Sequence, residues 1–153
     1  MGFGQLGLVA RFPAVNVATA GTVTLMQLVA PSGSRLVVNQ IAVSFNSDTN
    51  TDEPYQVQLL RQSGAGTSSA GLVYRLNTDD TLVPQSASRI VFTGEPTAQD
   101  ILFNWYIHPQ VGMIWEPPLD SPILVQGSGR LGIRVLAPIV QANSASGYMS
   151  YLE

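Results

Sequence analysis

Apolar and polar side chains alternate along most of this chain, in short segments separated by glycine, proline and small polar residues. A period of two is typical of a β-strand with one buried face. In the first such segment Val23, Leu25 and Val29 share a face that Gln27 interrupts. The pattern predicts strands at 23–29, 36–45, 55–59, 72–76, 89–93, 112–116, 121–127, 131–135 and 147–153.

Residues 96–109 fit two patterns. Thr97 and Asp100 have the spacing of a helix capping box. Ile101, Phe103, Trp105 and Ile107 alternate instead, and aromatic and β-branched side chains favour strands. The strand is the preferred interpretation.

Turn-forming residues cut the chain into pieces too short for long helices. Ten prolines and fourteen glycines are spread along the sequence. About eight to ten short strands without helical crossovers predict an all-β fold, an antiparallel sandwich or barrel. We expect one domain at 21–153, with 1–20 as an N-terminal arm or a first strand. The composition of 63–71 predicts a flexible loop.

Charge is scarce in this sequence. Only 17 of 153 residues are charged, none of them lysine, whereas 42 are Ser, Thr, Asn or Gln. Soluble domains usually carry roughly 25% charged residues. This composition favours a surface that lies against other protein, although neutral polar side chains also keep some β proteins soluble without a partner.

The same composition argues against several classes of function. There is no cysteine, which excludes thiol catalysis and thiolate metal sites. A net charge of −3 with seven scattered arginines provides no basic stripe for nucleic acid. The N-terminus lacks the basic opening of a signal peptide, and no apolar run approaches the roughly 20 residues of a membrane span, so we expect a soluble protein.

The segment GSGRLG at 127–132 matches the GxGxxG dinucleotide fingerprint. That fingerprint requires a helix after the glycines, whereas LGIRVLAP predicts a strand ended by proline. A glycine-rich hairpin turn is the preferred interpretation, and no cofactor is expected.

Asp48, Asn50 and Asp52 alternate as the first ligands of a calcium loop do. An EF-hand would need Gly at 53 and Glu at 59, where this chain has Glu53 and Leu59. A solvated acidic loop is favoured, and a looser calcium site that uses Glu53 stays open.

Catalytic residues are not evident. His108 is the only histidine, and a GxSxG elbow is missing, so a strand end explains His108 more simply than a catalytic triad. Asp79 and Asp80 are adjacent and would point apart in an extended segment. We therefore expect no enzyme.

Trp105, Tyr106 and Trp115 offer an alternative function. Exposed aromatic rings could form a sugar-stacking platform on a carbohydrate-binding module of a phage tail or fibre. Aromatic residues in strands belong to the core more often.

The C-terminal part, 92–153, resembles small virion proteins of tailed phages. The resemblance rests on a HPQ-G turn (His108 to Gly112), a W-PP segment (Trp115, Pro117 and Pro118), GSGRLGIR (127–134), the break at Ala137-Pro138, and the last strand, Tyr148 to Glu153. A weaker match covers 55–67.

This resemblance implies a jelly-roll decoration or cement protein on the capsid surface, made in the host cytoplasm. Its partners would be the major capsid protein and further copies of itself, with a homotrimer as the first expectation. Residues 1–20 would then be a candidate arm that adds a strand to a neighbour or lies along the shell.

Overall fold

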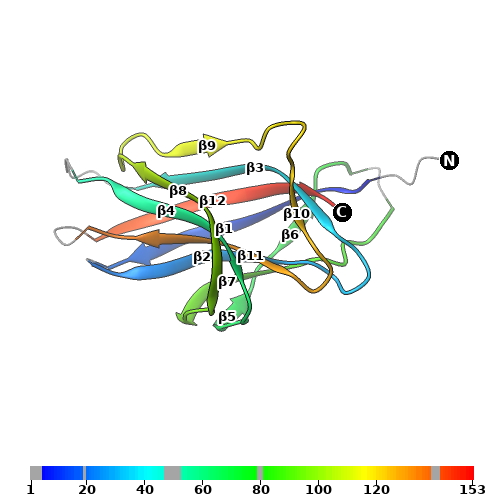
Figure 1. The fold of residues 1–153 in the computed structure, drawn as a ribbon, viewed down its shortest axis with the longest axis horizontal. Coiled ribbons are helices and arrows are strands. Elements are labelled where there is room, and N and C mark those ends of the chain that lie inside the picture. Colours follow the sequence, from blue (N-terminus) through cyan, green and yellow to red (C-terminus); the bar gives the residue numbers. More distant parts are fainter. Residues whose placement is uncertain (1–4, 19, 47–52, 79–80, 139–141) are drawn as a thin grey trace.

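A computed structural model describes residues 5–18, 20–46, 53–78, 81–138 and 142–153 of the chain. These residues form twelve β-strands, and none of them lies in a helix, so they contain no helix that could cross a membrane (Figure 1). The strands pack as two six-stranded antiparallel sheets, which confirms the predicted all-β sandwich.

Each sheet is assembled from strands distant in sequence. Sheet A contains β1 (Gly7–Val17), β3 (Leu36–Phe45), β6 (Val73–Arg75), β9 (Met113–Trp115), β10 (Ile123–Val125) and β12 (Asn143–Leu152). Sheet B contains β2 (Thr22–Val29), β4 (Tyr55–Gln62), β5 (Thr67–Ala70), β7 (Ala87–Gly94), β8 (Ala98–Ile107) and β11 (Arg130–Leu136).

The strand order is that of a jelly roll. In sheet A, β12 lies between β1 and β3, and β9 and β10 both pair with the far edge of β3. In sheet B the order β2-β11-β4-β8 faces it. The chain crosses between the sheets at most connections, and only β4–β5, β7–β8 and β9–β10 stay within one sheet.

The hydrophobic core fills the space between the sheets. Alternate residues of the central strands point inward, and the pairing registers bring them together across neighbouring strands. The largest fully buried side chains are Tyr55, Tyr151, Leu8, Leu25, Met26, Leu28, Leu36, Ile41, Leu59, Leu60, Leu131 and Ile133.

β2 contains a bulge, and its buried face therefore differs from the predicted one. Met26 pairs with Ile133 and Thr24 pairs with Arg134, so Leu25 is one extra residue in β2. Beyond the bulge, Met26 and Leu28 point into the core, whereas Gln27 points to the outer side of sheet B. The predicted single face through Leu25 and Val29 is therefore wrong.

The N-terminal segment is a strand of its own sheet over the described residues. β1 pairs with β12 from Gly7 to Val17, with a bulge at the position of Pro13. Leu6 and Glu153 exchange two backbone hydrogen bonds, each 3.0 Å from nitrogen to oxygen. These hydrogen bonds place the beginning of β1 beside the end of β12 (Figure 1).

Residues 63–97 form an excursion between β4 and β8, called the insert below. It contains β5, β6 and β7, so the flexible loop predicted at 63–71 is wrong: Thr67–Ala70 pairs with β7. β5 has no apolar alternation because it is an exposed edge strand. With β5, and with β1 counted as a strand, the total of twelve exceeds the predicted eight to ten.

Two carboxylates hold β7 of the insert at its ends. Glu153 accepts hydrogen bonds from the Gln85 and Ser86 backbone N–H groups, at 2.9 and 3.0 Å, and from Ser86 Oγ at 2.6 Å. Glu95 accepts from the Thr24 backbone N–H at 2.8 Å and from Thr24 Oγ1 at 2.6 Å. Hydrogen bonds to a charged acceptor are stronger than neutral ones.

We predict that Gly147→Ala destabilises the fold by about 3 kcal/mol, because strand crowding leaves no room for a side chain. A Cβ at Gly147 would lie 2.0 Å from the Ala42 carbonyl oxygen and 2.8 Å from the Phe12 ring. Gly33→Ala is the control, since nothing lies within 4 Å of its Cβ. Urea unfolding measures both, and equal stability of the two variants would contradict the packing described.

Alkaline pH should weaken the fold through Tyr151. Burial raises the pKa of this phenol to about 12 from 10.0, against the lowering effect of its hydrogen bond to Ser86. The folded state therefore holds the proton more tightly than the unfolded state. Stability is full below pH 10 and falls between pH 10 and 12, by at most about 3 kcal/mol.

Thermal unfolding at graded pH checks this fall. Tyr151→Phe should reduce the fall above pH 10 without removing it, since burial also raises the pKa of Tyr55. An unchanged pH profile in Tyr151→Phe would contradict the role given to Tyr151.

Candidate interaction face on sheet A

The GSGRLG segment is a turn followed by a strand, as predicted, but it is not a hairpin. Gly129 N donates to the Gln126 carbonyl at 2.7 Å, and β11 starts at Arg130. β10 pairs with β3 in sheet A and β11 pairs with β2 and β4 in sheet B. The turn therefore connects the two sheets, and no helix follows the glycines.

His108 lies directly after β8, in a tight turn. Its backbone carbonyl accepts hydrogen bonds from Val111 and Gly112, at 3.0 and 3.3 Å. Its Nδ1 accepts from the Gln110 backbone N–H at 3.3 Å. These contacts give His108 a turn-forming role at the strand end.

Most residues of the possible calcium loop and of the carboxylate pair lie outside the described residues. These are Asp48, Asn50 and Asp52 of the loop, and Asp79 and Asp80 of the pair. Glu53 is described and exposed. Within the described ranges, no three His, Asp or Glu side chains gather closely enough to hold a metal ion.

Trp105 and Trp115 come together, but Tyr106 does not join them. Phe103, Trp105 and Trp115 form a cluster at the edge where β8 and β9 meet, with ring centroids 4.6 to 5.5 Å apart. Both tryptophans are half-buried and pack against the core. Tyr106, 69% exposed, points to the other side of β8. The three rings do not form one sugar platform.

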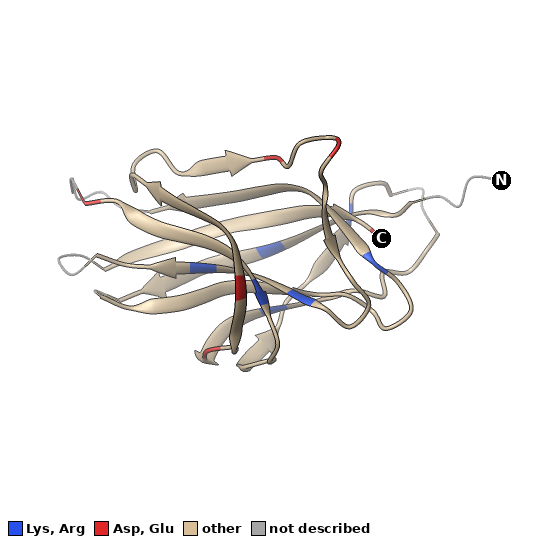
Figure 2. Cartoon of the chain, in the orientation of Figure 1, with Lys and Arg blue, Asp and Glu red and all other residues tan. Residues whose placement is uncertain are grey.

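The outward side of sheet A is broad and almost free of charge. It is named here the sheet A face and consists of Val9, Arg11, Val37, Gln40, Ala42, Ser44, Tyr74, Ile114, Ser146, Tyr148, Ser150 and Leu152, which alternate with inward residues in the registers of the sheet. β3 and β12, in its centre, carry no charged residue (Figure 2).

The face is ordered by hydrogen bonds between strands. Tyr148 donates through its hydroxyl to Gln40 Oε1, and Gln40 Nε2 donates to Glu116 Oε1 at 2.6 Å. Ser44 and Ser146 share a hydrogen bond of 3.1 Å between their hydroxyls. These contacts link β12, β3 and the segment after β9 across the face.

The one cation on the face is also engaged. Arg11 Nη2 donates to the Tyr74 hydroxyl at 3.2 Å, and its guanidinium lies 5.0 Å from the Tyr74 ring centroid. Arg11 thus marks the β6 side of the face, whereas Glu116 marks the β9 side.

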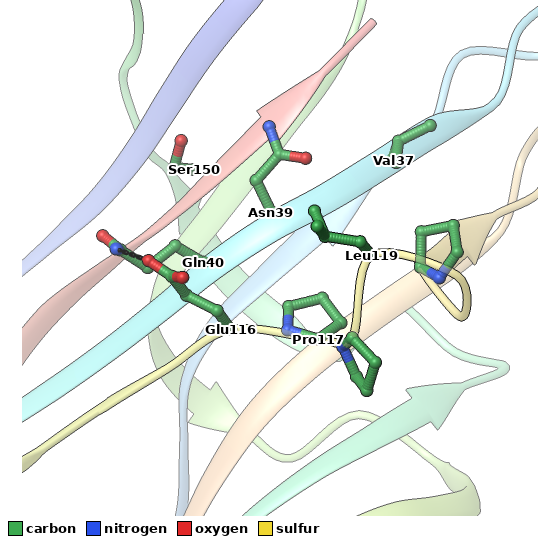
Figure 3. A pocket seen from close by; sticks show the side chains of 9 residues that line it. Val37, Asn39, Gln40, Glu116, Pro117, Leu119 and Ser150 are labelled. Carbon is green, nitrogen blue, oxygen red and sulfur yellow. Dashed lines mark hydrogen bonds between the residues drawn. The ribbon is translucent and has the colours of Figure 1, made fainter.

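Shallow hollows and exposed apolar side chains border the face. Figure 3 shows one hollow, where Glu116, Pro117 and Leu119 stand beside Gln40 and Ser150. A second and more apolar hollow lies between Ile114 and Tyr148, above Ala42. Ile114 is 70% exposed and Leu119 is fully exposed. On the opposite side, Leu72 and Leu76 are exposed beside β6.

The outward side of sheet B is partly covered by the insert. Gln27 and Gln62 are buried there, with Gln27 Nε2 donating to Gln62 Oε1 at 2.8 Å and to the Gly64 carbonyl at 3.0 Å. Gly132 leaves space for Gln62, since a Cβ would lie 2.4 Å from Gln62 Oε1. Sheet A therefore presents the more open of the two faces.

Sequence reasoning did not find the sheet A face. The signal available was the series of small hydroxyl residues at alternate positions of β12, Ser144, Ser146 and Ser150. Assembling the face required the pairing of β12 with both β1 and β3, which brings together residues more than 100 positions apart.

Comparisons with known proteins provide no identification: no family model matches the chain, and neither a curated protein nor a solved structure matches it significantly.

Replacement by alanine should lower the stability of the fold at the half-buried Trp115 but not at the exposed Tyr106. We predict that Trp115→Ala costs about 2 kcal/mol of unfolding free energy, because its half-buried ring closes the sandwich edge. Tyr106→Ala, on the exposed side of β8, should stay within about 0.5 kcal/mol of the parent. Urea titration measures both. A Trp115→Ala variant as stable as the parent would show that the ring is not part of the core.

Proposed function

We propose that this chain is a structural virion protein that decorates a phage head and stabilises it by binding the major capsid protein and further copies of itself. The sheet A face is the observation that carries this proposal. Its centre consists of hydroxyl, amide and small apolar side chains, and the charged groups at its two sides, Arg11 and Glu116, have partners within the chain. Such a surface can be buried with little loss of charge solvation.

Three of the segments that resemble phage virion proteins lie on or beside this face, whereas GSGRLGIR (127–134) leads into β11 of sheet B. The turn from His108 to Gly112 leads into β9, and Trp115 to Pro118 continues to the hollow beside Gln40. The last strand of the resemblance is β12, in the centre of the face. Part of the resemblance and the uncharged surface therefore concern the same region of the molecule.

The energy of such a contact is adequate for a cement protein. Burying apolar surface contributes roughly 25 cal/mol per Å². An apolar area of about 300 Å² would therefore contribute about 7 kcal/mol per copy, before the cost of association. Many copies on one shell multiply this stabilisation. The trimer implied by the resemblance stays a prediction.

Copy number tests the proposal. Quantitative mass spectrometry of virions from a phage that encodes this chain should find hundreds of copies per particle. Heads that lack the protein should break at lower temperature and on dilution, and adding the purified protein back should restore their resistance. A handful of copies per virion, or heads equally resistant without the protein, would contradict the proposal.

A further inference from the structure

The geometry points to a second copy of this chain as the occupant of the sheet A face, in a two-fold face-to-face contact. This inference deepens the proposed function and rests on its self-association. The axis would run parallel to the strands, between β3 and β12. It would place β12 of one copy over β3 of the other, and β1 of one copy over β9 of the other.

Side-chain size across this axis is complementary. The registers place Arg11, Tyr148, Ala42 and Ile114 in one row across the sheet. In the two-fold contact Tyr148 of each copy, still bonded to its own Gln40, lies over Ala42 of the other copy, beside the apolar hollow between Ile114 and Tyr148. Ser146 lies over Ser44 in the next row. Each large side chain therefore meets a small one, and every such pair occurs twice because the contact is isologous.

Charge across this axis is complementary as well. Arg11 and Glu116 lie on opposite sides of the face, and Glu116 is hydrogen-bonded to Gln40, one row along the strands from Arg11. Because the two-fold axis places β1 of one copy over β9 of the other, Arg11 of one copy lies beside Glu116 of the other. Strand residues two apart are about 7 Å apart, which an arginine side chain spans.

The size of the contact sets the expected affinity. With strands about 4.8 Å apart and about six residues long within the contact, the four strand positions that overlap, namely β1, β12, β3 and the edge formed by β9 and β10, cover about 400 Å² per copy. The total of about 800 Å² lies below the range of stable specific complexes and is typical of a weak contact. Aligned sheets pack well about 10 Å apart. We expect a weak dimer, with a dissociation constant of roughly 100 µM, that becomes strong when many copies are held on one particle.

Light scattering and sedimentation equilibrium at 10–300 µM test the contact. The mass should rise with concentration toward an even multiple of 16.3 kDa. Ile114→Arg should raise the dissociation constant about tenfold or more, because it places a second cation opposite Arg11 of the other copy, twice. Tyr106→Arg is the matched control, with nearly equal exposure on sheet B, and should dimerise as the parent does.

A charge exchange tests the two-fold geometry itself. Arg11→Glu and Glu116→Arg should each weaken dimerisation about tenfold, and the double variant should recover most of the loss. Circular dichroism and thermal unfolding confirm that each variant folds. A monomer or a trimer over this range, equal effects of Ile114→Arg and Tyr106→Arg, or no recovery in the double variant would overturn the inference.

Head binding by the same variants separates this inference from the proposed function. A parent chain that stays monomeric but binds heads overturns the two-fold contact and leaves the decoration role intact. A chain that dimerises as described but ignores heads overturns the decoration role alone.

Discussion

Antiparallel pairing of β12 with both β1 and β3 is the interaction on which the rest of this structure depends. It joins the first and last strands of the chain in the middle of sheet A. Because side chains alternate along each strand, the pairing that packs Met149 and Tyr151 into the core also places Tyr148 and Ser150 on the outward side. Core and candidate interface are therefore two consequences of one register, and a shift by one residue would destroy both.

The polar side chains of the sandwich are used mainly to hold segments in place. Glu95 satisfies the backbone N–H of Thr24 at a point where β7 pairs only with Met26–Val29 of β2. Glu153 holds the segment before β7 in the same way. On sheet B, the buried glutamines bond to each other and to the loop after β4. A chain with few charges thus places two of its carboxylates where unpaired backbone groups need acceptors.

Local sequence pattern was enough to predict most of the strands. Alternation identified the β8 strand against a competing helix, and the turn at 127–129 was recognised because a strand, not a helix, follows it. The bulge at Leu25 was missed because one inserted residue reverses the faces without changing composition. β5 was missed because an edge strand such as Thr67–Ala70 needs no apolar face. The sheet A face could not be predicted, since it depends on which strands become neighbours.

The reciprocal hydrogen bonds of Leu6 and Glu153 bring the beginning of β1 and the end of β12 to one point on the molecule. Any segment joined before Leu6 and any segment joined after Glu153 would leave the sandwich from neighbouring strand ends. A short covalent linker between them would preserve the sheet, and new ends opened in the solvent-exposed Ser32–Ser34 turn would give a circularly permuted chain with the same strand order in space.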